Sequence, residues 1–275
     1  MQESTPNFFV IGAMRSATTS LCEILSLHPQ VFMSKPKELN FFSNNSVFCQ
    51  GWNWYRDNFA AAHAKAAIGE GSTNYTKQSL YPRAAERLAE YCPNARLIYI
   101  VRHPLQRIES HWLHMLRMGI DPSTLAEALR LMPDMLDISL YWKQIDVYRR
   151  LFPDDRILVL FLEDLIENPG AVIARCCEFL RLAPVTEVTG ARVHSNGYAD
   201  VPIDGKILRL LRRIPGIQGL ARTVPLRAAV RLLKRPPPAP SWPADLRAQI
   251  VDQLAPDSGR FLDFYGKPPN FWPLN

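Results

Sequence analysis

A continuous apolar run, Leu97-Ile98-Tyr99-Ile100-Val101, constrains the fold of this chain more than any other feature. A strand with one face in water alternates apolar and polar residues, whereas this run carries no charged position. Such a run is typical of a strand buried on both faces, as in the parallel sheets of α/β proteins. Strands are predicted at residues 7–12, 31–33, 67–70, 96–101 and 156–162.

Helical patterns separate these strands. The expected helices are 18–27, 52–59, 81–91, 105–118, 124–132, 138–151 and 170–182, followed by a final pair, 244–254 and 257–265. Strands that alternate with helices predict an α/β chain with three layers (αβα) and a central parallel sheet. With 275 residues, of which 47% are apolar, the chain can bury one sizeable core, so residues 1–275 are expected to form a single domain.

Positive charge is concentrated in one segment, residues 203–235. It contains Lys206, Arg209, Arg212, Arg213, Arg222, Arg227, Arg231, Lys234 and Arg235, opposed only by Asp204. Two interpretations remain open: a solvated face of amphipathic helices, or a surface that attracts an anionic cofactor, glycan or lipid headgroup. Because a Pro-rich stretch follows, residues 203–240 are interpreted as a basic insertion or cap. No nucleic acid is expected, since no RNA-binding aromatic motif accompanies the charge.

Three observations bear on the compartment. No run of 18 apolar residues is present, so stable membrane insertion is not expected. Residues 1–7 are polar and acidic, unlike a signal peptide. The 5 cysteines form an odd set without C-x-x-C spacing, which predicts reduced thiols in a cytoplasmic protein. The sequence carries no sign of the oligomeric state.

The first predicted strand ends in a loop, residues 12–19, with the sequence GAMRSATT. A strand, a turn and a helix in this order aim free backbone N–H groups and the positive helix end at one point, where a phosphate or sulfate can bind. Ser16, Thr18 and Thr19 add hydroxyl donors, and Arg15 adds a fixed positive charge. The alternative is an ordinary helix cap by Ser or Thr.

This loop is not a Walker A loop. Ala17 stands where the second Gly belongs, and Thr18 stands where the Lys belongs. The strand at 96–101 ends in Arg102-His103-Pro104 rather than in an Asp that could hold Mg²⁺. We therefore expect the loop to bind an anion without an obligatory metal ion.

Six blocks resemble the sulfotransferases that use 3′-phosphoadenosine 5′-phosphosulfate (PAPS), in the branch of heparan-sulfate-type and soluble bacterial enzymes. In chain order they are FFVIGAMRSATTSLCEILSLHP, KPKELNFFS, GEGSTNYT, RLIYIVRHPLQRIESHW, RILVLFLEDLIENPGAVIARCCEFLRL and LAPDSGRFLDFYG. They run over most of residues 7–182 and 244–275. The resemblance implies a P-loop-NTPase-like sulfotransferase fold with PAPS as co-substrate and no metal. Because the sequence shows no membrane anchor, a bacterial cytoplasmic enzyme is expected rather than a Golgi enzyme.

The resemblance also implies two anion sites. Arg15, Ser16, Ala17, Thr18 and Thr19 would bind the 5′-phosphosulfate. The 3′-phosphate would bind Arg102 and Ser110, with Arg107 on the same helix face, and Lys234 and Arg235 would lie over that phosphate or the adenine.

The resemblance assigns the general base to Glu38, within Lys37-Glu38-Leu39-Asn40-Phe41-Phe42. A carboxylate can accept the proton of an acceptor hydroxyl while sulfur bonds to the oxygen. Phe41 and Phe42 would form apolar walls that raise the pKa of Glu38. The acceptor would be a small-molecule, saccharide or carrier-bound hydroxyl.

Two positions depart from the family pattern. Arg15 stands where the family usually has Lys, and Arg does not practically give up its proton. Arg15 would then clamp charge only, with Lys35 or Lys37 assisting. Ala17 replaces a usual Gly, so a left-handed backbone there would be costly and would distort the loop.

Two other functions remain as alternatives. One is a nucleotide-dependent phosphotransferase, which the missing Walker Lys and strand-end Asp disfavour. The other is a non-catalytic module that binds an anion or a glycan through the basic segment.

Overall fold

A central parallel sheet organises the computed structural model, which describes residues 5–184, 203–204 and 234–274. Its strands are β1 (Phe8–Gly12), β2 (Val31–Met33), β3 (Ala67–Gly71), β4 (Arg96–Val101) and β5 (Ile157–Phe161). Their order is β2-β3-β1-β4-β5, and all neighbours run parallel. The predicted α/β fold is confirmed, and the apolar run 97–101 is fully buried in β4.

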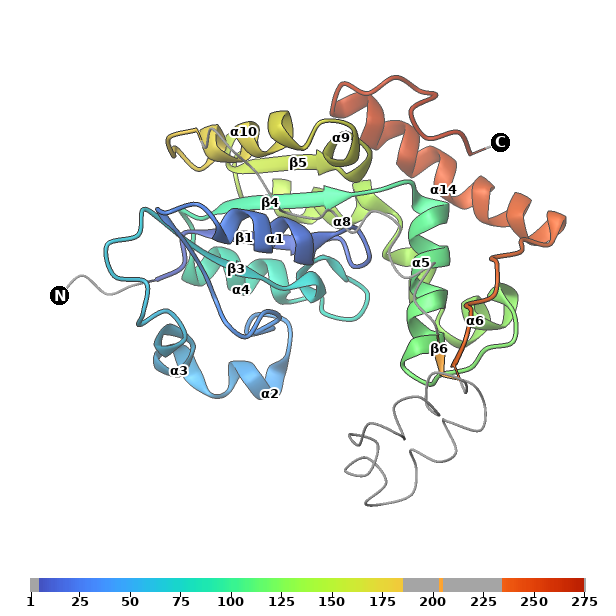
Figure 1. Ribbon diagram of the computed structural model, residues 1–275, viewed down its shortest axis with the longest axis horizontal. Coiled ribbons are helices and arrows are strands. Elements are labelled where there is room, and N and C mark those ends of the chain that lie inside the picture. The colour runs from blue at the N-terminus through green and yellow to red at the C-terminus, as the bar shows by residue number, and fades with distance from the viewer. Residues whose placement is uncertain (1–4, 185–202, 205–233, 275) are drawn as a thin grey trace, which may run out of the picture.

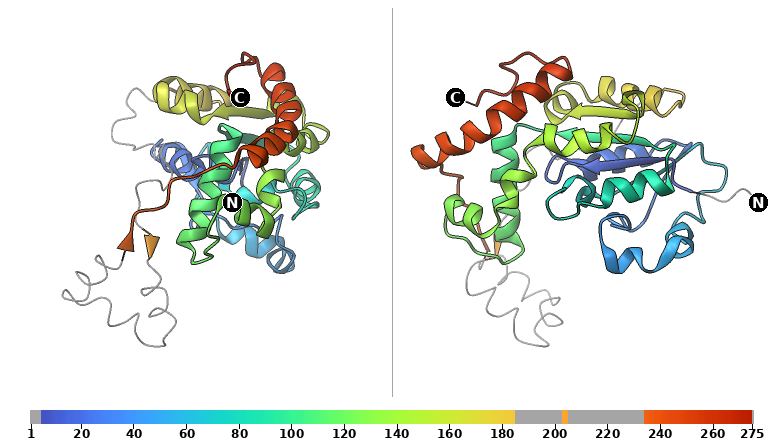
Figure 2. Two further views of the ribbon diagram at one scale, coloured as in Figure 1. Left: turned by 90° about the vertical axis from the view of Figure 1, so that its right-hand side faces the viewer. Right: turned by 180° about the vertical axis from the view of Figure 1, so that it is seen from behind.

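Helices cover both faces of the sheet (Figures 1 and 2). One face carries α1 (Thr18–Ser26), α9 (Leu162–Glu167) and α10 (Pro169–Phe179). The other carries α3 (Gly51–Asp57), α4 (Ala84–Tyr91) and α8 (Tyr141–Arg149), with α2 (Asn45–Phe48) next to α3. Beyond the carboxyl end of β4 stand α5 (Pro104–Arg117), α6 (Leu125–Leu131) and α7 (Asp134–Asp137).

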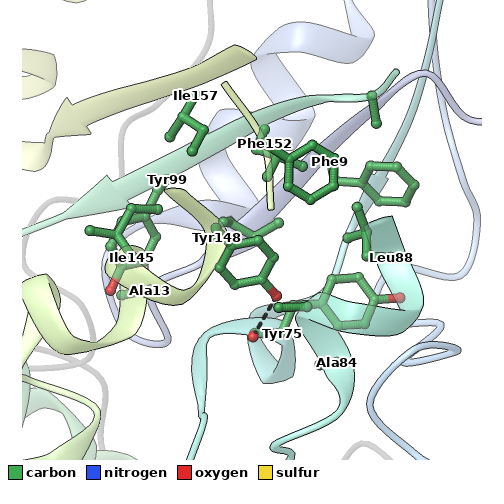
Figure 3. Close-up of a cluster of buried hydrophobic side chains, with 14 of the residues drawn as sticks. Phe9, Ala13, Tyr75, Ala84, Leu88, Tyr99, Ile145, Tyr148, Phe152 and Ile157 are labelled. Atoms are coloured by element: carbon green, nitrogen blue, oxygen red, sulfur yellow. Dashed lines mark hydrogen bonds between the residues drawn. The ribbon is translucent and has the colours of Figure 1, made fainter. Parts of the chain in front are cut away.

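The core between the sheet and α4 and α8 is rich in aromatic rings (Figure 3). Tyr148 of α8 reaches across this layer, and its hydroxyl donates a hydrogen bond of 2.7 Å to the carbonyl oxygen of Tyr75. Tyr75 belongs to η1 (Thr73–Thr76), a 3₁₀ turn that directly follows β3. The core therefore fixes the turn that leaves the carboxyl end of β3.

The predicted pair of C-terminal helices is wrong, because the structure has one helix, α14 (Ala244–Phe264), with Pro256 inside it. A proline lacks the N–H that a helix interior needs, so it normally ends or kinks a helix. Here both halves of α14 are held by packing. Leu254 joins the cluster around α5, and Phe261 packs against Tyr141 and Phe161.

The ends of the basic segment form a short strand pair. Strand β7 (Lys234–Arg235) runs antiparallel to β6 (Ile203–Asp204), and Lys234 lies opposite Asp204. The pair lies beside α5 (Figure 1). Residues 205–233 and the side chains of Lys234 and Arg235 lie outside the described residues, so their predicted roles stay predictions. In the described part of the chain, no helix combines the length and apolarity needed to cross a membrane.

Candidate active site

The predicted anion loop begins where β1 passes closely by two neighbours. A Cβ on Gly12 would lie 1.9 Å from Thr76 Oγ1 and 3.1 Å from Tyr99 Cε2, so only glycine fits. Arg15 and Ala17 then adopt left-handed backbone angles, with φ of 71° and 62°. The loop thus curls into the start of α1, and Ala17 takes the conformation that we expected its Cβ to make costly.

The loop hydroxyls differ in their surroundings. Ser16 is fully buried, and its Oγ has no hydrogen-bond partner among the residues that the structure describes. Thr18 is buried, and its Oγ1 accepts a hydrogen bond of 3.4 Å from Lys37 Nζ. Thr19 is exposed. A buried hydroxyl without a partner is costly, so Ser16 Oγ suits a ligand that completes its bonding.

Arg15, Arg102 and Ser110 lie together. Arg15 Nε donates a hydrogen bond of 3.2 Å to Ser110 Oγ, and Arg102 Nη1 donates one of 3.5 Å to the Arg15 carbonyl oxygen. Arg102 Nε is buried without a partner in the described chain, and Nη2 bonds Gln106. The loop after β1 and the residues after β4 therefore form one cationic site at the carboxyl edge of the sheet.

Arg107 does not face the same anion as Ser110, contrary to the prediction. Its side chain is fully buried. Arg107 Nε donates a hydrogen bond of 2.6 Å to Ser139 Oγ, and Nη2 bonds the carbonyl oxygen of Met135. The residues around α7 cover this side of α5, so Arg107 joins α5 to that segment.

Glu38 lies beside the loop. Its Oε1 accepts a hydrogen bond of 2.7 Å from Lys37 Nζ, and its Oε2 accepts one of 2.8 Å from the backbone N–H of Thr73. The Glu38 side chain is 35% exposed, so an acceptor can reach it. Lys37 Nζ also bonds Thr18 and therefore connects the carboxylate to the anion loop.

The family model of the sulfotransferase domain matches residues 5–194, well over half of the chain. The chain belongs to this family. Three of the segments that carry the resemblance, 12–19, 37–42 and 102–110, meet around Arg15, Lys37 and Glu38.

Curated relatives and solved structures agree with this membership. Heparan sulfate glucosamine 3-O-sulfotransferase 5 of Mus musculus is 25% identical over 196 residues, which cover 66% of this chain. The chain spans about half of that relative, 55% of its length. In fold, the chain is similar to a sulfotransferase from Alicyclobacillus acidocaldarius, with a TM-score of 0.70, 20% identity, and coverage of 98% and 99% of the two chains. The sulfotransferase domain of the curacin biosynthetic pathway matches with a TM-score of 0.54 and 18% identity, covering 92% of this chain and 98% of that one.

The aromatic pair in this sulfotransferase-family site has another role than the predicted one. Phe41 and Phe42 are buried in the core, with ring centroids 4.3 and 5.4 Å from that of Tyr55. They anchor the segment that carries Glu38 rather than forming walls around its carboxylate.

The electrostatic environment of the site favours anions. Burial and the nearby Arg107 lower the pKa of His111 to about 2, and burial and Arg15 lower the pKa of His114 to about 4. Burial also lowers the pKa of Lys77, which Glu38 partly opposes. Both histidines are therefore neutral at pH 7, because cations surround them in a region shielded from water.

Two contributors were not identified from the sequence. Thr73 bonds Glu38 through its backbone N–H at 2.8 Å and through its hydroxyl, whose Oγ1 lies 3.3 and 3.4 Å from the two carboxylate oxygens. Thr73 is 35 positions from Glu38 in the sequence, so no local pattern links the two residues. Lys77 follows the GEGSTNYT block directly, and only the turn η1 brings it near Glu38 and α5.

Proposed function

We propose that this chain is a PAPS-dependent sulfotransferase that transfers a sulfuryl group to an acceptor hydroxyl. One observation carries the proposal: Lys37 Nζ lies 2.7 Å from Glu38 Oε1 and 3.4 Å from Thr18 Oγ1. A carboxylate and an ammonium group thus stand beside the loop where the phosphosulfate would bind. The chain's membership of the sulfotransferase domain family supports this assignment.

The described residues fit the donor PAPS. The loop 15–19 and the N-terminus of α1 would bind the 5′-phosphosulfate, with Ser16 Oγ gaining the partner that it lacks in the described chain. Arg102 and Ser110 would bind the 3′-phosphate, to which the buried Arg102 Nε can donate. Lys234 and Arg235 are proposed to add charge over that phosphate or the adenine. No metal ion is needed in this arrangement.

The reaction is an in-line transfer. Glu38 accepts the proton of the acceptor hydroxyl while the oxygen of that hydroxyl forms a bond to sulfur. The bond between sulfur and the bridging phosphate oxygen breaks, and its electron pair leaves with adenosine 3′,5′-bisphosphate (PAP). Arg15 stabilises the negative charge that develops on the leaving oxygen, and Lys37 stabilises charge on the sulfuryl oxygens.

A saccharide hydroxyl is the acceptor class best supported by the relatives. The mouse relative is named a heparan sulfate glucosamine 3-O-sulfotransferase. The net charge of +6 favours an acidic saccharide over a neutral one. Small-molecule and carrier-bound hydroxyls belong in the same acceptor panel.

Glu38→Gln tests the proposal. Loss of the general base should lower turnover of PAPS with the best acceptor about 10²- to 10⁴-fold. Calorimetry should show PAP affinity within a few-fold of the wild type, because the amide keeps the shape of the side chain.

Glu23→Gln, at an exposed position of α1, is the matched control and should leave turnover unchanged. Full activity of Glu38→Gln would contradict the assignment of the base. PAP binding without any turnover in the wild type would instead favour a non-catalytic binding module.

A further inference from the structure

A second carboxylate, Glu70 of β3, is fully buried below the site. In the described part of the chain, hydroxyl groups supply its hydrogen bonds. Tyr75 donates at 2.9 and 3.0 Å to the two carboxylate oxygens, Ser72 donates to Oε1, and Tyr55 donates to Oε2. Burying a carboxylate costs free energy, so a position like this calls for a role beyond packing.

Two of these hydroxyls also hold the segment that carries Glu38. Ser72 Oγ accepts a hydrogen bond of 3.0 Å from the backbone N–H of Asn40. The Tyr75 hydroxyl accepts one of 3.5 Å from the backbone N–H of Phe42. Each hydroxyl has a single proton, and donating it to Glu70 leaves the oxygen lone pairs directed at these amides.

The segment needs such support, because its backbone is strained. Glu38 and Asn40 both adopt left-handed angles, with φ of 62° and 55°. Asn tolerates this conformation better than most residues, whereas for Glu38 it is costly and persists where surrounding contacts determine it. Glu38 N–H bonds the Gly71 carbonyl oxygen at 2.9 Å, and Asn40 Nδ2 bonds the Glu38 carbonyl oxygen at 2.8 Å.

We propose that Glu70 is a positioning residue for Glu38. Its ionised carboxylate orients the hydroxyls of Ser72 and Tyr75 so that both accept amides of the segment 38–42. That orientation keeps the Glu38 carboxylate beside Lys37 and the anion loop. The inference rests on the proposed function, in which Glu38 is the base.

The surroundings of Glu70 make its charge sensitive to pH. Burial raises the pKa of Glu70 to about 7, against the hydrogen bonds from Ser72, Tyr55 and Tyr75, which lower it. The negative charge of Glu38 is a smaller contribution to this net increase. Five other titratable groups face Glu70, from α1, α3, η1, α8 and the end of α4: Cys22, Tyr55, Tyr75, Tyr148 and Cys92. Burial raises the pKa of each group, so all five are neutral at pH 7.

Activity and stability should therefore respond to pH in opposite directions. Positioning requires ionised Glu70, so the rate of PAPS turnover should rise with increasing pH, with an apparent midpoint near pH 7. Between pH 4.5 and about 7, the native state holds a proton on Glu70 that the unfolded chain has released. The free energy of unfolding contributed by Glu70 consequently falls as the pH rises through this interval.

The experiment uses Glu70→Gln in the full chain and two readouts. The first is single-turnover hydrolysis of PAPS to PAP, in which water takes the place of the unidentified acceptor. The second is hydrogen–deuterium exchange of the amides of residues 38–42. Because the Tyr75 hydroxyl bonds both carboxylate oxygens, the NH₂ group of the introduced amide faces this hydroxyl in either orientation. The NH₂ group then competes with the Phe42 N–H for the Tyr75 oxygen.

Matched variants separate positioning from packing. Tyr75→Phe and Ser72→Ala each remove a hydroxyl that contacts both Glu70 and the segment. Tyr55→Phe removes a hydroxyl that, among the residues the structure describes, is hydrogen-bonded to Glu70 and not to the segment 38–42. At pH 8.5, Glu70→Gln, Ser72→Ala and Tyr75→Phe should slow hydrolysis about tenfold or more and speed exchange at 38–42, whereas Tyr55→Phe should do neither.

Glu70→Gln should also lose the rate midpoint near pH 7. The proposal is overturned if Glu70→Gln keeps the wild-type rate, midpoint and exchange, or if Tyr55→Phe matches Ser72→Ala in both readouts. If Glu70→Gln does not fold, the comparison of the other three variants decides. An unaffected rate in Glu38→Gln would refute the base assignment, while the exchange readout would still test the positioning.

Discussion

At the scale of single residues, Arg15 and Lys37 supply the positive charge in the proposed mechanism. Arg15 stands in the anion loop where the family usually has Lys, and it contacts Ser110 of α5. A guanidinium group keeps its proton at any physiological pH. Lys37 contacts Thr18 and Glu38, so its ammonium group lies between the anion loop and the carboxylate. Of the two lysines considered from the sequence, Lys37 is the one with these contacts.

Arg15→Ala should lower the steady-state rate of PAPS turnover more than tenfold, because the leaving oxygen loses its fixed positive charge. Arg15→Lys should retain more activity than Arg15→Ala, since the charge is kept. A loss below tenfold in Arg15→Ala would remove Arg15 from the mechanism.

Lys37→Met should lower kcat at least tenfold and leave the Kd for PAP within about threefold, because PAP carries no sulfuryl group for Lys37 to contact. Lys35→Met, at an exposed position two residues away, serves as the comparison and should stay within threefold of the wild-type kcat. The reverse ranking of these two variants would contradict the role given to Lys37.

At the scale of elements, close approach decides where glycine is required. A Cβ on Gly69 in β3 would lie 2.1 Å from Phe8 Cζ and 2.7 Å from Met33 Sδ, both in neighbouring strands. A Cβ on Gly259 in α14 would meet nothing within 4 Å. The same substitution should therefore have opposite effects at these two positions.

Gly69→Ala should lower the free energy of unfolding by about 1–3 kcal/mol, through overpacking of the sheet. Gly259→Ala should raise it by up to about 1 kcal/mol, because alanine favours an exposed helix position. Urea denaturation of both variants measures these changes. Equal effects at the two positions would show that the packing around Gly69 is looser than the structure has it.

The sequence predicted the strands better than the ends of the helices. Apolar composition marks a buried strand directly, and β4 (96–101) has the predicted bounds. The predicted helix pair, 244–254 and 257–265, left Pro256 between its members. Local preference argues against proline in a helix, whereas the packing of Phe261 and Leu254 overrides this preference. The helices α2, α7 and α9 have 4 to 6 residues, too few to show a periodic pattern.

At the scale of the whole molecule, the site forms because three parallel strands end at one edge. The loop after β1, the turn after β3 and Arg102 after β4 meet there, as ligand sites do at the carboxyl ends of parallel strands. The resemblance located Arg15, Glu38 and Ser110 in the sequence. It could not show that Arg107 points into the protein, since the 135–139 segment that covers it is distant in sequence.

Ligand binding should stabilise the whole chain by mass action. PAP at 100 times its Kd should raise the free energy of unfolding by about 2.7 kcal/mol. Arg102→Ala should lose most of this stabilisation at the same PAP concentration. If PAP raised the unfolding temperature of Arg102→Ala as much as that of the wild type, the 3′-phosphate would bind somewhere other than at Arg102.

Calorimetry of PAP binding tests the central claim most directly, with EDTA present and ATP as the comparison ligand. A sulfotransferase site built on Arg15, Ser16 and Arg102 should bind PAP in the micromolar range, independently of EDTA, and ATP much more weakly. Tight, Mg²⁺-dependent binding of ATP without binding of PAP would contradict the account and favour a nucleotide-dependent phosphotransferase.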